Sequence, residues 1–410
     1  MKTTMVNTYK YLIIGGGMAG DSAAKAIRKI DPEGTIGMIS QDNKEPYDRP
    51  PLSKGLWKDI DYDEIGRDTA DLGVDLHLLT TATKLDANKK LVRDDNGEEY
   101  KYGKLLLATG GTPRKLKIDV EDIIYYRTAD DYLKLRALTD ECNNFGVIGG
   151  GFIGSEIAAA LAMNGKKATM LFLEKGLCGQ ILPESLSLHL SEYYQEKGVE
   201  LHPEEAVTSV EKLDGGFTVK TNAGSELTFD AIVAGLGIIP ETGLAASAGI
   251  EIGNGIIVNE YLETSKKDIF AAGDVACMTN PALGVPMRFE HEDNANSSGE
   301  VAGKNMAGKK TVYDHLPFFY SDLFDLGYEA IGETNPGLDI VPDWQEELEQ
   351  GVIYYMSENV VRGVLLWNVL GRVDEARDII NSGKTYEPGD LVDLIQKTSI
   401  PFKDDEEDDE

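Results

Sequence analysis

Cysteines, long apolar runs and basic residues are all scarce in this sequence, and each shortage argues against a class of protein. There are three cysteines, Cys142, Cys178 and Cys277, and no two of them form a CxxC pair. This spacing argues against a disulfide framework, a thiolate metal site and a dithiol relay, so we predict no metal site. The longest apolar runs, LLLATGG and YLIIGGG, are far too short to cross a bilayer, so no membrane span is expected.

Acidic residues outnumber basic residues by 71 to 40, which gives a formal net charge of −31 at pH 7. Nucleic acids and anionic membranes attract clustered cations, so we expect neither as a partner. The final segment, KDDEEDDE, has the composition of a solvated chain end, and residues 401–410 are predicted to be a disordered acidic tail. No basic and apolar leader precedes the first strand pattern near Tyr9, so a cytoplasmic location is expected.

Two segments place a glycine pattern between an apolar strand and a helix rich in small residues. They read YKYLIIGGGMAG, from residue 9, and FGVIGGGFIGSEIAAAL, from residue 145. Their GxGxxG glycines are Gly15, Gly17 and Gly20, and Gly149, Gly151 and Gly154. The first glycine makes a tight turn, the second lets a pyrophosphate approach the backbone, and the third lets the helix pack on the strand. Two such units predict two dinucleotide sites, one for FAD and one for a nicotinamide dinucleotide.

The residue that should bind the ribose differs between the two units. In the second unit, Glu174 stands 20 residues beyond the last glycine of the motif, where a ribose-binding acid is expected. It favours NADH over NADPH, although the adjacent Lys175 is compatible with a 2′-phosphate. In the first unit no acid stands at the usual position, so Gln41 or Asp42 must serve.

Three further segments extend the pattern. LLLATGGTPR, residues 105–114, is a buried strand that ends in a turn of small residues and is suited to a crossing between domains. DIFAAGDVA, residues 268–276, delivers Asp274 to a helix start, where its carboxylate can accept hydrogen bonds from a flavin ribitol chain. In YDRPPLSK, residues 47–54, two prolines stiffen a loop that holds Arg49 and Lys54.

With these motifs the sequence resembles the flavoprotein reductases that have two dinucleotide domains. The YDRPPLSK loop narrows the resemblance to the ferredoxin-reductase-like branch, which includes oxygenase-coupled reductases and apoptosis-inducing factor. Stretches such as LEKGLCGQILPE and WNVLGRVDEARDII lean toward the latter. The resemblance covers roughly residues 9–384. It implies an α/β protein with two Rossmann-like dinucleotide-binding domains, for FAD and NAD, and an α+β C-terminal domain.

The predicted domains follow from the same pattern. They are a split FAD domain of residues 1–112 and 237–312, an inserted NAD domain of residues 113–236, and a C-terminal domain of residues 313–400. The last domain is expected to act as an interface or lid, or alternatively to form a homodimer. Its acidic, turn-rich segment PGLDIVPDWQEELEQ is predicted to be a loop.

The resemblance implies roles for particular residues. Arg49 would help to hold FAD, and Lys54 would reach the reactive edge of the flavin, where a cation stabilises the reduced ring. Glu156 would pair with Lys54 where nicotinamide and flavin meet, so these two are the candidate catalytic residues. Phe152 would cover the nicotinamide approach. The alternatives are surface cations for the loop, a first-turn acid complementing the helix dipole for Glu156, and simple packing for Phe152.

The full set of predicted contacts combines motif and resemblance. The FAD contacts are Gly15, Gly17, Gly20, Gln41, Asp42, Arg49, Lys54, Gly110, Asp274, Glu290 and His291. The NAD contacts are Gly149, Gly151, Phe152, Ile153, Gly154, Glu156, Glu174, Lys175 and Gly237. His291 is expected to pack over the flavin rather than to act as an acid or base, because hydride transfer needs stacking and distance.

The predicted activity is an NADH-dependent FAD oxidoreductase that passes a hydride to flavin and then electrons to a quinone, a small electron carrier or dioxygen. With no second cysteine beside the flavin, an internal disulfide acceptor is excluded. An acidic ferredoxin would be repelled unless a local basic patch exists, so it ranks below a quinone or an undefined acceptor. Tyr320 stands where related ferredoxin reductases carry tryptophan, which leaves the acceptor open. The alternative is a redox-responsive flavoprotein that holds a charge-transfer complex with NAD and signals through partner binding or dimerisation.

Overall fold

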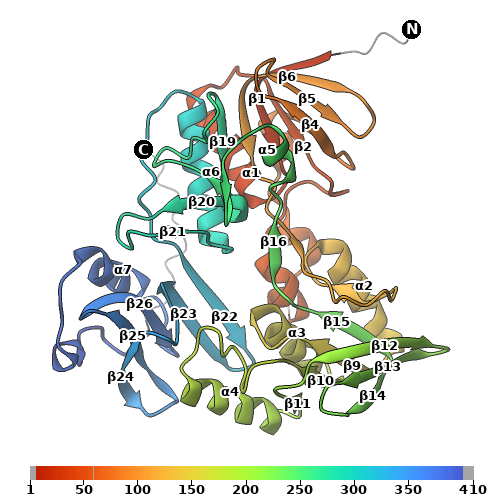
Figure 1. The fold of residues 1–410 in the computed structure, drawn as a ribbon, viewed down its shortest axis with the longest axis vertical. Coiled ribbons are helices and arrows are strands. Elements are labelled where there is room, and N and C mark those ends of the chain that lie inside the picture. Colours follow the sequence, from red (N-terminus) through yellow and green to blue (C-terminus); the bar gives the residue numbers. More distant parts are fainter. Residues whose placement is uncertain (1–5, 59, 400–410) are drawn as a thin grey trace. The chain divides into compact units, whose positions relative to one another are not determined.

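The computed structural model describes residues 6–58 and 60–399, so the predicted tail at 401–410 lies outside the described residues. The chain forms two compact units (Figure 1). The first joins Met1–Thr112 to Ile238–Pro317, and the second joins Pro113–Gly237 to Phe318–Glu410. No helix within the described ranges combines the length and apolar character that a bilayer crossing requires.

The first unit is built on a seven-stranded sheet of order β3-β2-β1-β6-β5-β4, with β19 also paired to β6. Its strands are β1 (Val6–Ile14), β2 (Ile36–Ile39), β3 (Val74–His77), β4 (Ala82–Asp86), β5 (Leu91–Asp94), β6 (Glu99–Leu107) and β19 (Ile269–Ala271). Strands β1, β2, β3, β6 and β19 run parallel, whereas β4 and β5 form antiparallel pairs. This is the doubly wound arrangement whose ligands bind at the carboxyl ends of the strands.

Helices α1 (Met18–Ile30) and α6 (Glu292–Met306) pack against each other in the first unit (Figure 1). Their contact is close because a Cβ at Gly299 or Gly303 of α6 would overlap the backbone oxygen of Ala19 or Ala23 of α1. The alanine-rich sequence of α1 and the glycines of α6 therefore bring a segment of the late chain beside the first glycine motif.

The rest of the first unit consists of short elements. They are η1 (Pro50–Ser53), η2 (Gly55–Trp57), η3 (Tyr62–Ile65), η4 (Thr69–Leu72), β7 (Gly111–Pro113), β16 (Ile238–Pro240), α5 (Gly243–Ser247), β17 (Ile252–Gly253), β18 (Gly255–Ile257), η5 (Gly273–Val275), β20 (Ala276–Thr279) and β21 (Pro286–Met287). Strands β7 and β16 pair with each other where the chain leaves and re-enters this unit.

The second unit contains a parallel sheet of order β11-β10-β9-β15-β8 and a three-stranded antiparallel sheet. Its elements up to Gly237 are β8 (Ile124–Tyr125), α2 (Ala129–Glu141), β9 (Asn144–Ile148), α3 (Phe152–Met163), β10 (Lys167–Leu171), α4 (Glu184–Glu196), β11 (Glu200–His202), β12 (Val207–Leu213), β13 (Gly216–Thr221), β14 (Glu226–Phe229) and β15 (Ala231–Ala234). The central strands are fully buried along most of their length, as parallel strands covered on both faces should be.

The same unit ends in an antiparallel sheet of order β22-β23-β26-β25-β24, drawn in blue in Figure 1. Its elements are β22 (Phe318–Leu323), β23 (Leu326–Gly332), β24 (Asp339–Glu346), β25 (Gln350–Ser357), β26 (Val360–Trp367), α7 (Val373–Ser382) and η6 (Pro388–Leu391). The predicted fold class is confirmed: two parallel α/β sheets, each with a glycine motif, accompany an α+β C-terminal part.

The loop predicted for PGLDIVPDWQEELEQ is wrong, because most of that segment is strand β24. The acidic residues and Pro342 of this segment are typical of a turn, which is why a loop was predicted. Among the residues that the structure describes, β25 is the one strand that pairs with β24, so β24 lies at the edge of the sheet, where a proline that lacks an amide hydrogen is tolerated. Asp343 is buried there and forms an ion pair with Lys397 at 2.7 Å.

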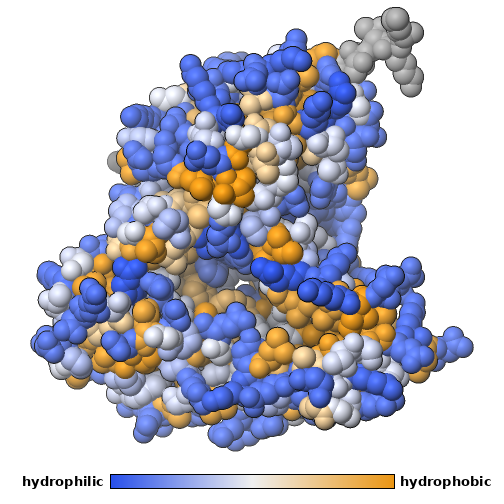
Figure 2. All heavy atoms as spheres, viewed as in Figure 1, coloured by the Kyte–Doolittle hydropathy of each residue, from blue (hydrophilic) through white to orange (hydrophobic). Residues whose placement is uncertain are grey.

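Hydrophilic residues dominate the face of the molecule drawn in Figure 2, and apolar residues form separate patches on it. Cys142, Cys178 and Cys277 are free thiols.

Candidate active site

The first glycine motif forms a turn that the chain itself demands. Gly15 has a φ of +119°, and a Cβ there would overlap the carbonyl oxygen of Ala108 at the end of β6. A Cβ on Gly20 would overlap the carbonyl oxygen of Gly15. A Cβ on Gly17, in contrast, would have no neighbour within 4 Å. The outer glycines are therefore required by packing, whereas the middle glycine faces open space.

The second motif repeats this arrangement in the second unit. Gly149 has a φ of +113°, and its Cβ would overlap the carbonyl oxygen of Gly235. A Cβ on Gly154 would overlap the carbonyl oxygen of Gly149, and a Cβ on Gly151 would have no neighbour within 4 Å. Packing does not explain why Gly17 and Gly151 lack a side chain, but a ligand that touches the backbone does.

Both middle glycines are the N-cap residues of the helices that follow, α1 and α3, and neither helix has a side-chain cap. The first amide groups of a helix have no intrahelical partner and carry partial positive charge. A pyrophosphate placed over either open glycine would accept hydrogen bonds from these amides. The two motifs therefore fit two dinucleotides.

Glu174 lies just beyond the carboxyl end of β10, the position expected of a ribose-binding acid. The side chain is half-buried, and Gln180 donates a hydrogen bond to its carboxylate at 2.7 Å. The neighbouring Lys175 is exposed and forms an ion pair with Glu184 at 2.9 Å. The hydrogen bond to Glu184 raises the pKa of Lys175. Lys175 is thus already engaged by a carboxylate.

In the first unit, Gln41 is exposed and Asp42 is half-buried after β2. The hydroxyl of Tyr47 donates a hydrogen bond to Asp42 at 2.9 Å, so the candidate ribose acid is tied to the proline loop. The guanidinium of Arg49 lies 5.6 Å from the centre of the Tyr47 ring. Asp42 and Arg49 are therefore both fixed around Tyr47.

The proline loop folds into two consecutive 3₁₀ turns, η1 and η2, with Pro50 at the first position of η1. Lys54 stands between them, with φ −126° and ψ −95°, and is half-buried. The indole of Trp57 donates a hydrogen bond to the carbonyl of Leu52 at 2.8 Å and closes the loop on itself. The rigidity expected from the prolines is thus reinforced by a buried tryptophan.

An ion-pair network around Arg67 was not predicted from the sequence. Its Nε lies 2.6 Å from the carboxylate of Asp21 in α1, and its Nη1 lies 2.5 Å from Asp48 in the proline loop. Its Nη2 also donates to the side-chain oxygen of Asn296 in α6 at 3.0 Å, and Thr69 donates to Asp21 at 2.7 Å. Asp21 is fully buried. The only local signal was an acid in an otherwise apolar helix start, which needs a buried cation.

Asp274 lies in η5, directly before β20, and is half-buried. Arg288 donates to its backbone oxygen at 3.0 Å and forms an ion pair with Glu290 at 2.5 Å. His291 is the N-cap residue of α6. Desolvation lowers the pKa of His291 to about 4, against the opposing effect of Asp274 and Asp293. The imidazole is therefore neutral at physiological pH, which agrees with a packing role.

Glu156 is the fifth residue of α3 and is 3% exposed. The first turn of this helix contains no acid, so the alternative that Glu156 complements the helix dipole there is wrong. Ser321 of β22 donates a hydrogen bond to its carboxylate at 2.6 Å. Lys54 belongs to the other unit, and its pairing with Glu156 stays a prediction.

Phe152 begins α3 and makes an edge-to-face contact with Phe319 of β22, with ring centres 5.1 Å apart. Ile153 is 37% exposed beside it. Gly110 and Gly237 both have positive φ, at +61° and +78°, as turns at the ends of strands require.

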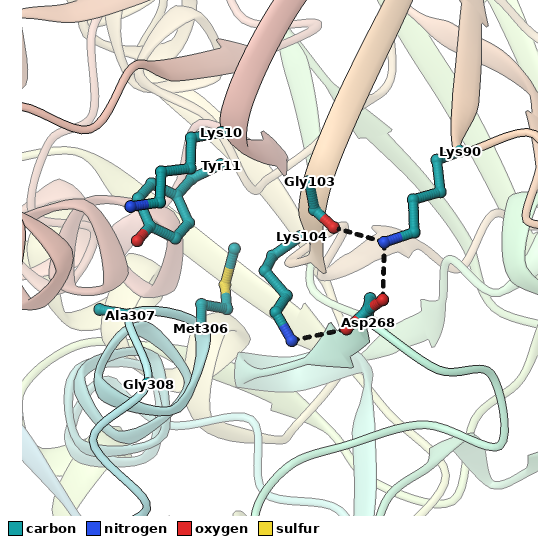
Figure 3. Close-up of a pocket in the computed structure, with 9 residues that line it drawn as sticks. All are labelled: Lys10, Tyr11, Lys90, Gly103, Lys104, Asp268, Met306, Ala307 and Gly308. Carbon is teal, nitrogen blue, oxygen red and sulfur yellow. Dashed lines mark hydrogen bonds and ion pairs between the residues drawn. The ribbon is translucent and has the colours of Figure 1, made fainter.

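A cavity of about 280 Å³ in the first unit lies apart from these residues (Figure 3). Lys90 and Lys104 both reach Asp268 there, at 2.6 and 2.5 Å. Its lining contains none of the predicted site residues. In the part of the chain that the structure describes, no group of three or more histidine, cysteine, aspartate or glutamate side chains is arranged to hold a metal ion.

Comparison with known proteins defines the class. The pyridine nucleotide-disulphide oxidoreductase family matches residues 9–299, and the family described as apoptosis-inducing factor, mitochondrion-associated, C-term matches residues 333–382. The chain belongs to the pyridine nucleotide-disulphide oxidoreductase family, and the predicted resemblance is confirmed. It is an NAD(P)H-dependent flavoprotein oxidoreductase of the ferredoxin and rubredoxin reductase type.

Individual relatives agree with this class. The chain is 35% identical to apoptosis-inducing factor 1, mitochondrial, of Dictyostelium discoideum, over 93% of this chain and 80% of that protein. It is 30% identical to the ferredoxin–NAD(+) reductase component of the anthranilate 1,2-dioxygenase system of Burkholderia cepacia, over 93% and 97%. The crystal structure of the ferredoxin reductase for the CYP199A2 system of Rhodopseudomonas palustris superposes with a TM-score of 0.86 at 27% identity, covering 93% of this chain and 96% of that chain.

Proposed function

We propose that this protein transfers a hydride from NADH to FAD and then passes electrons to a separate acceptor. The observation that carries the proposal is the pair of middle glycines, Gly17 and Gly151, which both face open space at a helix start. Bound FAD would supply a group that takes two electrons at once and releases them singly or in pairs. The protein would bind each dinucleotide in its own site and orient it for hydride transfer.

The FAD site is assigned to the first unit. The amides at the start of α1 would hold the pyrophosphate, and Asp42, fixed by Tyr47, would bind the ribose. Arg49 and Lys54 would meet the cofactor from the proline loop, with the cation of Lys54 stabilising negative charge on the reduced ring. Asp274 would accept hydrogen bonds from the ribitol hydroxyls.

The nicotinamide dinucleotide is assigned to the second unit, with NADH preferred over NADPH. Gln180 donates a hydrogen bond to the carboxylate of Glu174, which would bind the ribose diol. The same carboxylate would repel a 2′-phosphate. Lys175 is engaged by Glu184, so it gives that phosphate little compensation. Both observations support the preference for NADH that the sequence predicts.

A small electron carrier is the acceptor that the comparisons support, although the sequence ranked a ferredoxin below a quinone or an undefined acceptor. Ferredoxin and rubredoxin reductases recur among the relatives, and these names specify carriers for those proteins. The net charge of −31 requires the carrier to approach a surface that is locally less acidic. Quinone and dioxygen remain acceptors to be tested beside it.

A redox-responsive binding protein is the second candidate function. It is favoured by the match of residues 333–382 to the C-terminal family of apoptosis-inducing factor. In this case NAD would stay bound after reduction, and the reduced protein would recruit a partner or form a homodimer. The homodimer is part of this second candidate, whereas the proposed cytoplasmic location applies to both candidate functions.

Anaerobic stopped-flow mixing separates the two functions. The flavin-loaded protein is mixed with NADH or NADPH, and then with a ferredoxin, a quinone or dioxygen. A reductase bleaches rapidly with NADH and is reoxidised promptly by one acceptor. Slow bleaching and a long-lived absorbance at long wavelength, unaffected by every acceptor, support the redox-responsive binder instead.

Lys54→Ala tests the residue proposed to meet the flavin. Its matched control is Lys58→Ala, which removes an exposed lysine four positions along the same loop. We expect slower flavin reduction with FAD retained for Lys54→Ala and no change for Lys58→Ala. Equal reduction rates in both variants contradict the role of Lys54.

A further inference from the structure

We propose that strand β22 of the C-terminal sheet builds one wall of the nicotinamide site, and that Ser321 is the positioning residue that fixes the carboxylate of Glu156. This inference rests on the proposed function and on the catalytic role that the family resemblance predicts for Glu156 beside the nicotinamide. It gives the C-terminal sheet a part in the reaction itself, beyond the interface or lid role expected from the sequence.

The central observation is a short hydrogen bond between two fully buried side chains. The Oγ of Ser321 donates to Oε1 of Glu156 at 2.6 Å, and the two residues are 1% and 3% exposed. A carboxylate removed from water needs hydrogen-bond donors, and a bond to a charged acceptor is stronger than a neutral one. The Ser321 hydroxyl therefore determines where this oxygen of Glu156 lies.

A second side-chain contact, besides this hydrogen bond, joins β22 and α3. Phe152 and Glu156 are four residues apart, so they lie on one face of α3, and Phe319 and Ser321 are two apart, so they lie on one face of β22. Phe319 meets Phe152 edge to face at 5.1 Å, and Ser321 meets Glu156. One strand thus holds both side chains that α3 is proposed to present to the nicotinamide.

Two further polar groups, on Tyr328 and Cys178, lie beside the pair of Ser321 and Glu156. The hydroxyl of Tyr328, on β23, is buried beside Ser321 and Cys178 without a hydrogen bond of normal geometry. Burial raises the pKa of Tyr328 well above its ordinary value and raises the pKa of Cys178 to about 12. Both groups stay protonated at neutral pH, so they add no second negative charge next to Glu156.

Loss of the Ser321 hydroxyl would leave a buried oxygen of Glu156 without this donor. A carboxylate that loses this bond turns toward another donor, and this moves its charge away from the reacting centre. Ser321→Ala is therefore expected to slow hydride transfer more than it weakens NADH binding, because the dinucleotide is held mainly by the glycine loop and Glu174.

The test measures two quantities for each flavin-loaded variant: the limiting rate of anaerobic flavin reduction, and the dissociation constant of NAD⁺ by calorimetry. For Ser321→Ala we expect a reduction rate about tenfold lower, with a dissociation constant changed less than about threefold, as the loss of one hydrogen bond to a charged acceptor implies. Ser321→Thr keeps the hydroxyl and should stay within about threefold of the natural protein.

Thr139→Ala is the matched control for losing a buried hydroxyl. Thr139 lies in α2 of the same unit, is 5% exposed, and donates to the backbone oxygen of Arg136 at 2.6 Å. This variant should change neither the reduction rate nor the dissociation constant. If it slows reduction as much as Ser321→Ala does, general loosening of the unit explains the effect and the proposal is overturned.

A double-mutant cycle shows whether Ser321 acts through Glu156. In a Glu156→Ala background, Ser321→Ala should slow reduction less than about twofold further, because its target is gone. Independent, multiplying effects overturn the proposal, as does a natural reduction rate for Ser321→Ala. If NADH fails to reduce the natural protein at all, the proposed function falls and this inference falls with it, an outcome distinct from the others.

Discussion

Replacing Arg67 with methionine should destabilise the first unit and weaken its hold on FAD. The guanidinium neutralises Asp21, which is fully buried in the helix after the first glycine motif, and Asp48, which belongs to the proline loop. It also binds Asn296 of α6. A single side chain therefore joins three elements that surround the proposed FAD site, and the substitution releases all three.

The magnitude follows from the burial of Asp21. Removing one partner of a buried ion pair typically costs about 3–5 kcal/mol, because the other charge is left uncompensated. Lys25 stays 3.1 Å from Asp21, and the side chain of Asp48 is 36% exposed. We therefore expect a loss near the lower end, about 3 kcal/mol. For a unit of this size that corresponds to a fall in melting temperature of about 6–12 °C.

Urea unfolding and thermal melting measure this loss, and ultrafiltration measures FAD release. Arg93→Met is the control, since Arg93 pairs with Glu99 on the surface at 2.5 Å and such pairs contribute at most about 1 kcal/mol. Adding Asp21→Asn to Arg67→Met removes the uncompensated buried charge of Asp21 and should restore part of the free energy of unfolding. An Arg67→Met protein within about 1 kcal/mol of the natural one would refute the reasoning.

Three further predictions address the cofactors and pH. Gly17→Ala and Gly151→Ala should each change the free energy of unfolding by no more than about 1 kcal/mol, because the new methyl meets no protein atom. They should nevertheless weaken the binding of FAD and NADH, respectively, at least about tenfold. Normal affinities by calorimetry would contradict this prediction. Glu184→Ala removes the ion-pair partner of Lys175, which could then meet a 2′-phosphate. The ratio of kcat/KM for NADPH to kcat/KM for NADH should therefore rise about threefold. An unchanged ratio would show that Lys175 does not affect the choice of cofactor. The pKa of His291 falls from 6.5 to about 4 on folding, so the unfolded state binds an extra proton below pH 6.5. The free energy of unfolding should therefore decrease by about 2 kcal/mol from pH 7 to pH 5. Urea unfolding of His291→Asn should lack this decrease, and an identical decrease in that variant would contradict the role of His291.

The glycine motifs could be predicted because their spacing can be recognised in a short stretch of sequence, although Gly15 and Gly149 also meet the distant residues Ala108 and Gly235. Gly15 and Gly20 are needed within a few residues of each other, and the strand, turn and helix around them are legible from composition. The proline loop is similar, since Pro50 and Pro51 restrict their own neighbourhood and η1 begins there. The order of the domains was taken from the family resemblance and stays a prediction.

The contacts made over long stretches of chain could not be predicted in this way. Arg67 lies 46 residues from Asp21, and Ser321 lies 165 residues from Glu156, so nothing in the local pattern joins them. The strand β24 was missed for another reason: acids and proline usually mark turns, but an edge strand with one face in solvent accepts both.

The central claim is that this chain carries a hydride from NADH to its own FAD. The most direct test is an anaerobic titration of the purified protein with NADH, followed through the visible absorbance of the flavin. The account predicts a yellow protein whose absorbance bleaches in full after one NADH per flavin, with NADPH far less effective. A colourless protein that takes up no FAD, or a bound flavin that excess NADH leaves oxidised, would contradict it.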